Sequence, residues 1–238
     1  MRLRIALAVD DALPAVLGVL GARAAAEPEP TTGLVELADE TGALLADPWD
    51  VPPLVERGVT EAGIVAKHVV AECRPDVYEV VDLRVGRERV AVATLADARS
   101  TPSRRRPRIA TTHPRLCRSF FAARGVQVET LALRRAAEAA VLAGAADAAV
   151  LALSSDKART DGGLVAGDTI MASSARLIVN RSARVVRAAE LGALVDRLRL
   201  AVREADPEAG EAEGADEGDE IPPHLSADDV DDDLAGGE

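Results

Sequence analysis

The sequence predicts an α/β fold, and three observations support this prediction. Between residues 108 and 153, short apolar runs alternate with amphipathic stretches in the order strand, helix, strand, helix, strand, which is typical of a parallel sheet covered by helices. Of the 238 residues, 48% are hydrophobic, which is enough for a substantial core. No run approaches the roughly 20 apolar residues of a membrane-spanning helix, so we expect no membrane partner.

The first part of the chain predicts a strand, a helix and a hairpin. Residues 3–9 form an apolar run of strand length, and residues 13–20 have helical spacing up to Gly21, where a left-handed glycine can end a helix. Residues 34–45 alternate weakly around a Glu-Thr-Gly turn, so we expect two short strands there.

A second helix–strand unit follows. Asp50 is a residue type that caps helices, Pro52 and Pro53 suit a first helical turn, and Gly58 ends the helix before a strand at residues 62–66. Further strands are expected at residues 77–83 and 89–93.

The polar stretch 94–107 contains Pro102 and three consecutive arginines, which predicts a crossover or hinge near Thr94. The elements expected after it are a strand at 108–110, a helix from Pro114 to Gly125, a strand at 126–133, a helix at about 135–143, and strands at 148–153 and 174–180. A last helix carries Leu191, Leu194, Leu198 and Val202 at helical spacing, and we expect it to pack on the N-terminal lobe.

The segment that follows the strand at 148–153 is the first candidate site. Open α/β sheets bind ligands at the carboxyl ends of their strands, so the Ser-Ser-Asp-Lys-Ala-Arg-Thr run at 154–160 is placed to meet a ligand.

Charge is distributed unevenly along the chain. The formal net charge is -12, but residues 204–238 hold fifteen of the forty acidic residues and no Lys or Arg, which leaves the preceding residues at +3. We expect this acidic tail to be disordered, as a solubilising extension or a partner-binding arm. With 2% aromatic residues and little positive charge, nucleic acid is not an expected partner.

Cys73 and Cys117 are too few for a zinc site or a disulfide framework, so no protein metal site is expected, and they suit a reducing compartment. Asp10 and Asp11 interrupt the N-terminal apolar run before it reaches the length of a signal peptide. These features predict a cytoplasmic protein.

Several runs carry a resemblance to a known family. The runs are Asp47–Gly58, Glu61–Lys67, Asp76–Leu83, Arg108–Pro114, Phe121–Val128, Ala145–Asp147 and Ser173–Arg181. In order and spacing they are similar to the catalytic module of ATP phosphoribosyltransferase, in its short form without a regulatory C-terminal domain. The resemblance implies a two-lobed, periplasmic-binding-protein-like (type II) fold, with residues 1–93 and 172–203 in lobe I, 94–171 in lobe II, and 204–238 as the tail.

By the same resemblance, the reaction joins ATP to phosphoribosyl pyrophosphate with Mg²⁺, as the first step of histidine biosynthesis, in a cleft between the lobes of an oligomeric protein. No catalytic residue is assigned. The residues expected to bind substrate are Lys67, Arg87, Arg89, Glu138, Asp147, Ser154, Ser155, Asp156, Lys157, Ala158, Arg159 and Thr160.

The site positions of the family motifs differ here more than the framework positions do. Asp156 stands at a loop glycine that approaches phosphate, and Leu151 stands at an aspartate suited to ribose hydroxyls. The other exchanges are Asp10-Asp11 at a basic motif, Ala66 and Arg84 at glycines, His68 at an aspartate, and Thr112-His113 at a basic-aromatic pair. Two functions therefore remain open: a phosphoribosyltransferase with an altered substrate site, and a non-catalytic nucleotide-binding or regulatory paralogue that associates with a true ATP phosphoribosyltransferase.

Overall fold

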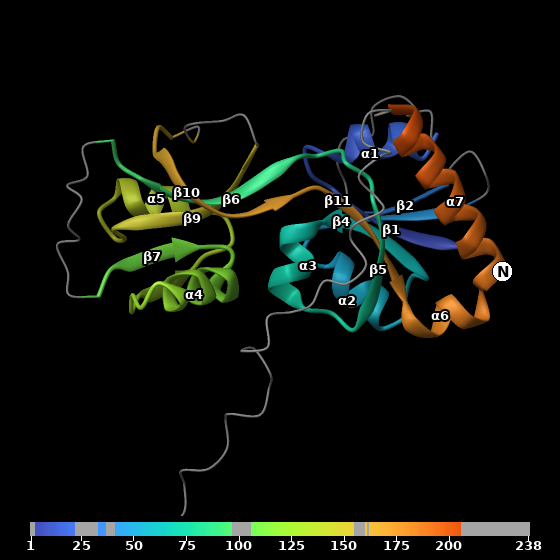
Figure 1. Cartoon of the computed structure of the whole chain (residues 1–238), viewed down its shortest axis with the longest axis horizontal. Helices are drawn as coiled ribbons and strands as arrows, with labels where there is room; N and C mark the ends of the chain where they lie inside the picture. The colour runs from blue at the N-terminus through green and yellow to red at the C-terminus, as the bar shows by residue number, and fades with distance from the viewer. Residues whose placement is uncertain are drawn as a thin grey trace, which may run out of the picture. The chain divides into compact units, whose positions relative to one another are not determined.

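The computed structural model describes residues 3–21, 33–36, 41–96, 106–154, 160 and 162–205 (Figure 1). Of residues 33–36 it describes the backbone alone. The expected loop residues 155–159 and the expected tail beyond residue 205 lie outside the described residues. The chain divides into one unit at Met1–Val202 and a second at Arg203–Glu238, and the following description concerns the first.

The described residues form eleven strands and seven helices. In chain order they are β1 (Arg4–Ala8), α1 (Leu13–Val19), β2 (Gly33–Glu36), β3 (Gly42–Ala46), α2 (Val51–Glu56), β4 (Ala62–Ala66), α3 (Lys67–Cys73), β5 (Val77–Asp82), β6 (Glu88–Thr94), β7 (Arg108–Thr111), α4 (Pro114–Ala123), β8 (Glu129–Ala132), α5 (Ala137–Leu142), β9 (Ala148–Ser154), β10 (Val165–Ser173), β11 (Ala175–Asn180), α6 (Arg181–Val186) and α7 (Ala188–Ala205).

The strands form two mixed sheets, which confirms the predicted α/β class. The first has the order β2-β3-β1-β4-β11-β5, and β1 runs parallel to β3 and β4. The second has the order β10-β6-β9-β7-β8, and β7 runs parallel to β8 and β9. The strand–helix alternation that the sequence predicts corresponds to β7, α4, β8, α5 and β9, and these three strands form the parallel part of the second sheet.

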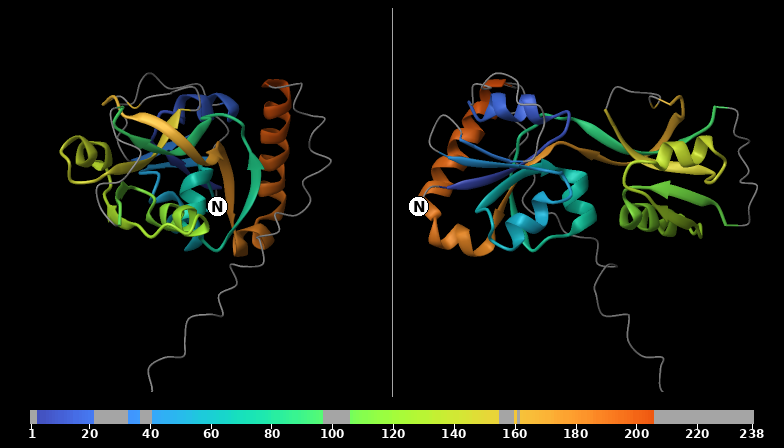
Figure 2. Two further views of the ribbon diagram at one scale, coloured as in Figure 1. Left: turned by 60° about the vertical axis from the view of Figure 1, so that its left-hand side comes forward. Right: turned by 180° about the vertical axis from the view of Figure 1, so that it is seen from behind.

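The first sheet is covered on one face by α7, as expected (Figure 2). Leu191, Leu194, Leu198 and Val202 of α7 are buried in the same cluster as Ile5, Leu7, Ile64 and Leu177 of the sheet. Each large aliphatic side chain fully buried in this way contributes about 1.5–3 kcal/mol. This packing holds the strands of the first sheet, whose ends carry part of the candidate functional site.

Sheet membership corrects the position at which the chain changes lobes. We expected the crossing near Thr94, with residues 89–93 still in the first lobe. Strand β6 instead belongs to the second sheet, because it hydrogen-bonds to β9 and β10. The chain therefore changes sheets at residues 83–87 and returns at Ser174, between β10 and β11 (Figure 1).

The first crossing requires an unusual backbone. Arg84 and Gly86 both have positive φ, 57° and 60°. A side chain at Gly86 would place its Cβ 2.5 Å from the Cβ of Ala12, so only glycine fits against the start of α1. Arg84 adopts the left-handed conformation without being a glycine, which costs about 1 kcal/mol.

Two expectations about local structure need correction. Asp50 occupies the N-cap position of α2, but its side chain makes no capping hydrogen bond. Strand β10 and helices α3 and α6 were not predicted. Helix α3 begins directly after β4, with no turn residue between them to signal it.

Candidate functional site

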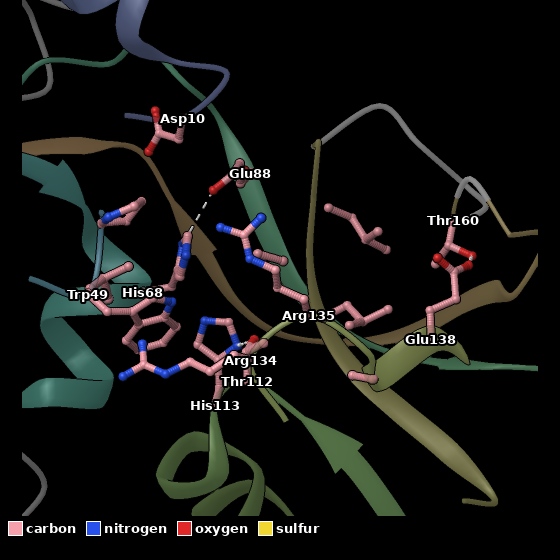
Figure 3. Close-up of a pocket in the computed structure, with 16 residues that line it drawn as sticks. Asp10, Trp49, His68, Glu88, Thr112, His113, Arg134, Arg135, Glu138 and Thr160 are labelled. Carbon is pink, nitrogen blue, oxygen red and sulfur yellow. Dashed lines mark hydrogen bonds and ion pairs between the residues drawn. The ribbon is translucent and has the colours of Figure 1, made fainter. Parts of the chain in front are cut away.

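A cavity of about 370 Å³ lies where residues of both sheets meet (Figure 3). Its lining comes from the ends of strands and the first turns of helices. The lining residues are Asp10, Pro48, Trp49, His68, Val69, Glu88, Thr112, His113, Arg134, Arg135, Ala137, Glu138, Leu151, Ala152, Leu153 and Thr160. This is the position that the topology of open α/β sheets favours for a ligand.

Three rings, which we call the ring cluster, form one side of the cavity: Trp49, His68 and His113. The His113 ring centroid lies 5.2 Å from that of Trp49 and 4.9 Å from that of His68. Burial lowers the pKa of His68 to about 4, and burial together with His68 lowers the pKa of His113 to about 3. Both imidazoles are therefore neutral at pH 7, and the cluster is an uncharged surface on which a planar group can stack.

His113 is held in place from the strand that precedes it. The Thr111 hydroxyl at the end of β7 donates to the carbonyl of Val150 and accepts from the backbone N–H of His113 at 2.8 Å. The His113 Nδ1 lies 2.8 Å from Thr112 Oγ1. Its Nε2 is buried and has no hydrogen-bond partner among the described residues, so this atom can still receive a ligand.

Asp10 and Glu88, which we call the acidic pair, line another part of the cavity. Burial raises the pKa of Asp10, and burial followed by the charges of Asp10 and Asp11 raises the pKa of Glu88 to about 7. Within the described part of the chain, the only basic side chain that forms an ion-pair contact with Glu88 is His68, whose Nδ1 lies 3.4 Å from Glu88 Oε2. Because His68 is neutral, the acidic pair has no compensating charge there.

Arg134 and Arg135, the arginine pair, follow β8 and precede α5. Arg134 lies beside Trp49, with its guanidinium 5.4 Å from the ring centroid, and Arg135 extends toward Glu88 (Figure 3). Neither forms an ion pair with a carboxylate of the described residues. Guanidinium groups are well suited to phosphate and carboxylate ligands.

Glu138 fixes the backbone at the far end of the cavity. Its Oε1 accepts hydrogen bonds from the Thr160 hydroxyl and, at 2.9 Å, from the backbone N–H of Gly162. A Cβ at residue 162 would lie 2.6 Å from the same oxygen, so glycine permits this approach. Thr160 Oγ1 in turn accepts from the N–H of the fully buried Leu164.

Of the residues expected to bind substrate, the structure brings Glu138 and Thr160 into this cavity. Several of the exchanged positions also line it, namely Asp10, His68, Thr112, His113 and Leu151. The other expected substrate-binding residues that are described do not line it. Lys67 pairs with Glu79, Arg89 donates to Thr169, Arg87 donates to the Arg84 carbonyl, Ser154 ends β9, and Asp147 accepts from the backbone N–H of Arg108. Ser155, Asp156, Lys157, Ala158 and Arg159 lie outside the described residues.

Sequence reasoning missed Trp49, Glu88 and the arginine pair as site residues. A signal for the arginines was present, because they directly follow an expected strand in the parallel part of the second sheet. Trp49 and Glu88 carry no such local signal. They reach the cavity only through the way the two sheets are assembled.

The fold and the site together define a class of protein, a two-sheet α/β protein with a cavity where residues of its two sheets meet. A solved structure of the Bordetella pertussis BvgS periplasmic VFT2 domain has a similar fold, with a TM-score of 0.50 and 14% identity, covering 85% of this chain and 92% of that one. This similarity concerns the fold alone.

The chain belongs to the ATP phosphoribosyltransferase family, whose model matches residues 47–200. An ATP phosphoribosyltransferase of Symbiobacterium thermophilum is 39% identical over 165 residues, 68% of this chain and 75% of that protein. One from Anaeromyxobacter dehalogenans is 37% identical over 189 residues, 79% of this chain and 82% of that protein.

A similar solved structure is an ATP phosphoribosyl transferase (HisG:HisZ) complex from Thermotoga maritima. Its matched chain has a TM-score of 0.71 and 18% identity, covering 85% of this chain and 99% of that one. This result confirms the fold that the sequence resemblance implies. Within the described ranges, no helix is both long and apolar enough to cross a bilayer.

Proposed function

We propose that this chain is an ATP phosphoribosyltransferase-like protein with an altered substrate site, which binds a nucleotide but does not support the family reaction at a comparable rate. The observation that carries the proposal is the acidic pair. Asp10 and Glu88 line the cavity, and no arginine or lysine among the described residues forms an ion pair with either of them, so they oppose a donor with several negative charges.

The remaining cavity groups support nucleotide binding. A base can stack on the ring cluster, which is uncharged and includes Trp49. The arginine pair offers guanidinium groups to phosphate oxygens. ATP is the first candidate, because the relatives are named as enzymes that act on it.

Mg²⁺ enters this proposal only with the nucleotide. No group of three or more His, Cys, Asp or Glu side chains in the described ranges could hold a metal ion. A phosphate-bound Mg²⁺ needs only one or two protein carboxylates, and Asp10 and Glu88 are of that type. The residues present thus suit a metal that arrives with phosphates better than a resident one.

Calorimetry and a turnover assay test the proposal together. We expect ATP with Mg²⁺ to give a binding isotherm, and phosphoribosyl pyrophosphate with Mg²⁺ to give none. The Symbiobacterium thermophilum relative, assayed in parallel with both substrates, serves as the active control. Formation of phosphoribosyl-ATP at a rate similar to the control would refute the altered-site proposal, and absence of ATP binding would refute nucleotide binding.

A second candidate function is association with another subunit as a regulatory paralogue. One structural neighbour is described as a complex of two proteins. On this chain, Val185 and Val186 of α6 are 80% and 79% exposed, an apolar surface that association could cover. Light scattering of the chain alone, and mixed with an active family member, tests this candidate: a stable homo- or hetero-oligomer is expected, and monomers in both samples would exclude it.

A further inference from the structure

We propose that the ligand of this cavity is an amine-bearing anion, whose ammonium group lies at the acidic pair and whose phosphate or carboxylate group lies at the arginine pair. This inference rests on the proposed function, because it names the chemical class of ligand for the same cavity. A ligand of this class carries a positive charge that the family substrates lack, and this charge strengthens binding.

Asp10 and Glu88 form no ion pair with an arginine or lysine of the described residues. Both carboxylates also line a narrow second cavity of about 10 Å³, so they stand at the junction of the two spaces. His68 contacts Glu88 but is held neutral by burial. Burial, followed by the charges of Asp10 and Asp11, raises the pKa of Glu88, and a cation placed between Asp10 and Glu88 would stabilise both carboxylates in their charged forms.

Positive charge without a carboxylate partner among the described residues also faces the cavity. Arg135 extends toward Glu88 in Figure 3, yet no ion pair joins the two. Arg134 contacts the face of Trp49 and has no carboxylate partner in the described part of the chain. Opposite charges thus face the same cavity without neutralising each other, and a ligand with both charges would neutralise both.

A buried polar atom in the cavity wall, the Nε2 of His113, supports the same inference without reference to charge. His113 is 2% exposed and lines the cavity, and its Nε2 finds no hydrogen-bond partner among the described residues. A buried polar atom without a partner costs free energy, so its presence in a cavity wall indicates a group that a ligand completes. A ligand hydroxyl can donate to this nitrogen or accept from it, according to the tautomer.

An ammonium group suits the acidic pair better than a metal ion does. An ammonium has three N–H donors and is satisfied by two or three acceptor oxygens. Mg²⁺ requires near-octahedral coordination by oxygen, and no cluster of three ligating side chains occurs in the described residues. The two occupants predict different dependence on Mg²⁺, so one experiment separates them.

The experiment compares two nucleotides that differ in one group: adenosine 5′-monophosphate and 3′-amino-3′-deoxyadenosine 5′-monophosphate. Each is titrated into the full-length protein by calorimetry at pH 7, with and without Mg²⁺. We expect the amino nucleotide to bind about tenfold more tightly without Mg²⁺, the effect of one charge-assisted hydrogen bond. We expect the preference to disappear in the double variant D10N/E88Q.

The control is Asp168→Asn, which removes an exposed carboxylate of β10 that does not line the cavity. It should keep the tenfold preference. Thermal melts should show D10N/E88Q folded and at least as stable as the parent, because the exchange removes buried uncompensated charge.

Equal affinity for the two nucleotides, a preference that survives in D10N/E88Q, or a preference that appears only with Mg²⁺ would each overturn the inference. These results would leave the proposed function standing, since both nucleotides would still bind. If neither nucleotide nor ATP bound, nucleotide binding itself would be refuted along with the inference.

Discussion

Two groups of carboxylates in this chain differ in whether arginine or lysine side chains pair with them. On β5, Glu79 and Asp82 pair with cations: Lys67 Nζ lies 2.8 Å from Glu79, and Arg176 lies 3.2 Å from Glu79 and 2.9 Å from Asp82. The acidic pair at the cavity has no such partner in the described residues. Compensated carboxylates serve the fold, whereas uncompensated ones that line a cavity are available to a ligand.

The same comparison bears on Lys67, which stays a prediction as a substrate-binding residue. By resemblance it is a substrate-binding cation, but in the structure it donates to both oxygens of Glu79. A cation held by a neighbouring carboxylate has little remaining attraction for phosphate. The arginine pair, which motif reasoning passed over, has the charge that Lys67 lacks.

The largest expected effect is on ligand binding by the arginine pair. The double variant R134A/R135A should weaken ATP binding about a hundredfold, since it removes two charge-assisted contacts of about 1.5 kcal/mol each. Calorimetry measures the change, with Arg199→Ala on α7 as a control outside the cavity. Unchanged affinity in R134A/R135A would show that the uncompensated cations do not face the nucleotide.

A smaller effect is expected on stability when the compensated group is broken. Arg176→Met leaves Glu79 with Lys67 alone and removes the cation that pairs with Asp82. We expect a loss of about 1–2 kcal/mol in the free energy of unfolding, less than for a fully buried pair because these side chains are 25% to 33% exposed. Urea denaturation measures it, and a neutral result would remove the distinction between the two carboxylate groups.

Removing a carboxylate of the acidic pair is expected to raise the stability of the protein, not to lower it. Because the pKa of Glu88 is raised from 4.5 to about 7, the folded state holds a proton that the unfolded state has lost, so this group lowers stability as pH rises between those values. Glu88→Gln should therefore stabilise the protein at pH 8 by about 1 kcal/mol, a value reduced by solvent screening of this partly exposed side chain.

The gain in Glu88→Gln should shrink as the pH falls through 7 and vanish below pH 4.5, where both states of the parent are protonated. Melting temperatures of parent and variant between pH 4.5 and 8 provide the measurement. A variant less stable than its parent at pH 8 would mean that Glu88 has a compensating partner after all.

The smallest expected effect concerns Lys67. Lys67→Met should change ATP affinity by less than about twofold, because this cation is already neutralised by Glu79 and does not line the cavity. Calorimetry under the conditions used for R134A/R135A gives a direct comparison. A tenfold loss would restore Lys67 to the binding site that the family resemblance assigns to it.

The fold was predictable where periodicity and turn residues agree. Strand β4 occupies the expected residues 62–66, and the helix from Pro114 ends at Ala123, just before Gly125, whose φ is 70°. Strand β10 was not predictable, because its residues are mostly half-buried or exposed and it is held by its pairing with β6. Its existence depends on a strand 80 positions away in the chain, which no local pattern reports.

The candidate site also contains residues that were expected from the sequence and residues that were not. Glu138 and Thr160 were expected in the site from the family resemblance, and they form a hydrogen bond to each other in the structure. The acidic pair joins residues from the ends of two different sheets, and the neutral state of His68 and His113 depends on burial that only the assembled protein provides. Sequence can indicate which residue types stand at strand ends, but not which charges remain without a partner.

The close approach of Gly86 to Ala12 influences the distance between the two acids of the cavity. Asp10 precedes Ala12 by two residues and Glu88 follows Gly86 by two, so the separation of the two acids depends on how closely one hydrogen atom and one methyl group approach. Enlarging residue 12 by a single carbon would push the acids apart with no change in their chemistry. The distance between the two acids would in this way change from a position that does not line the larger cavity.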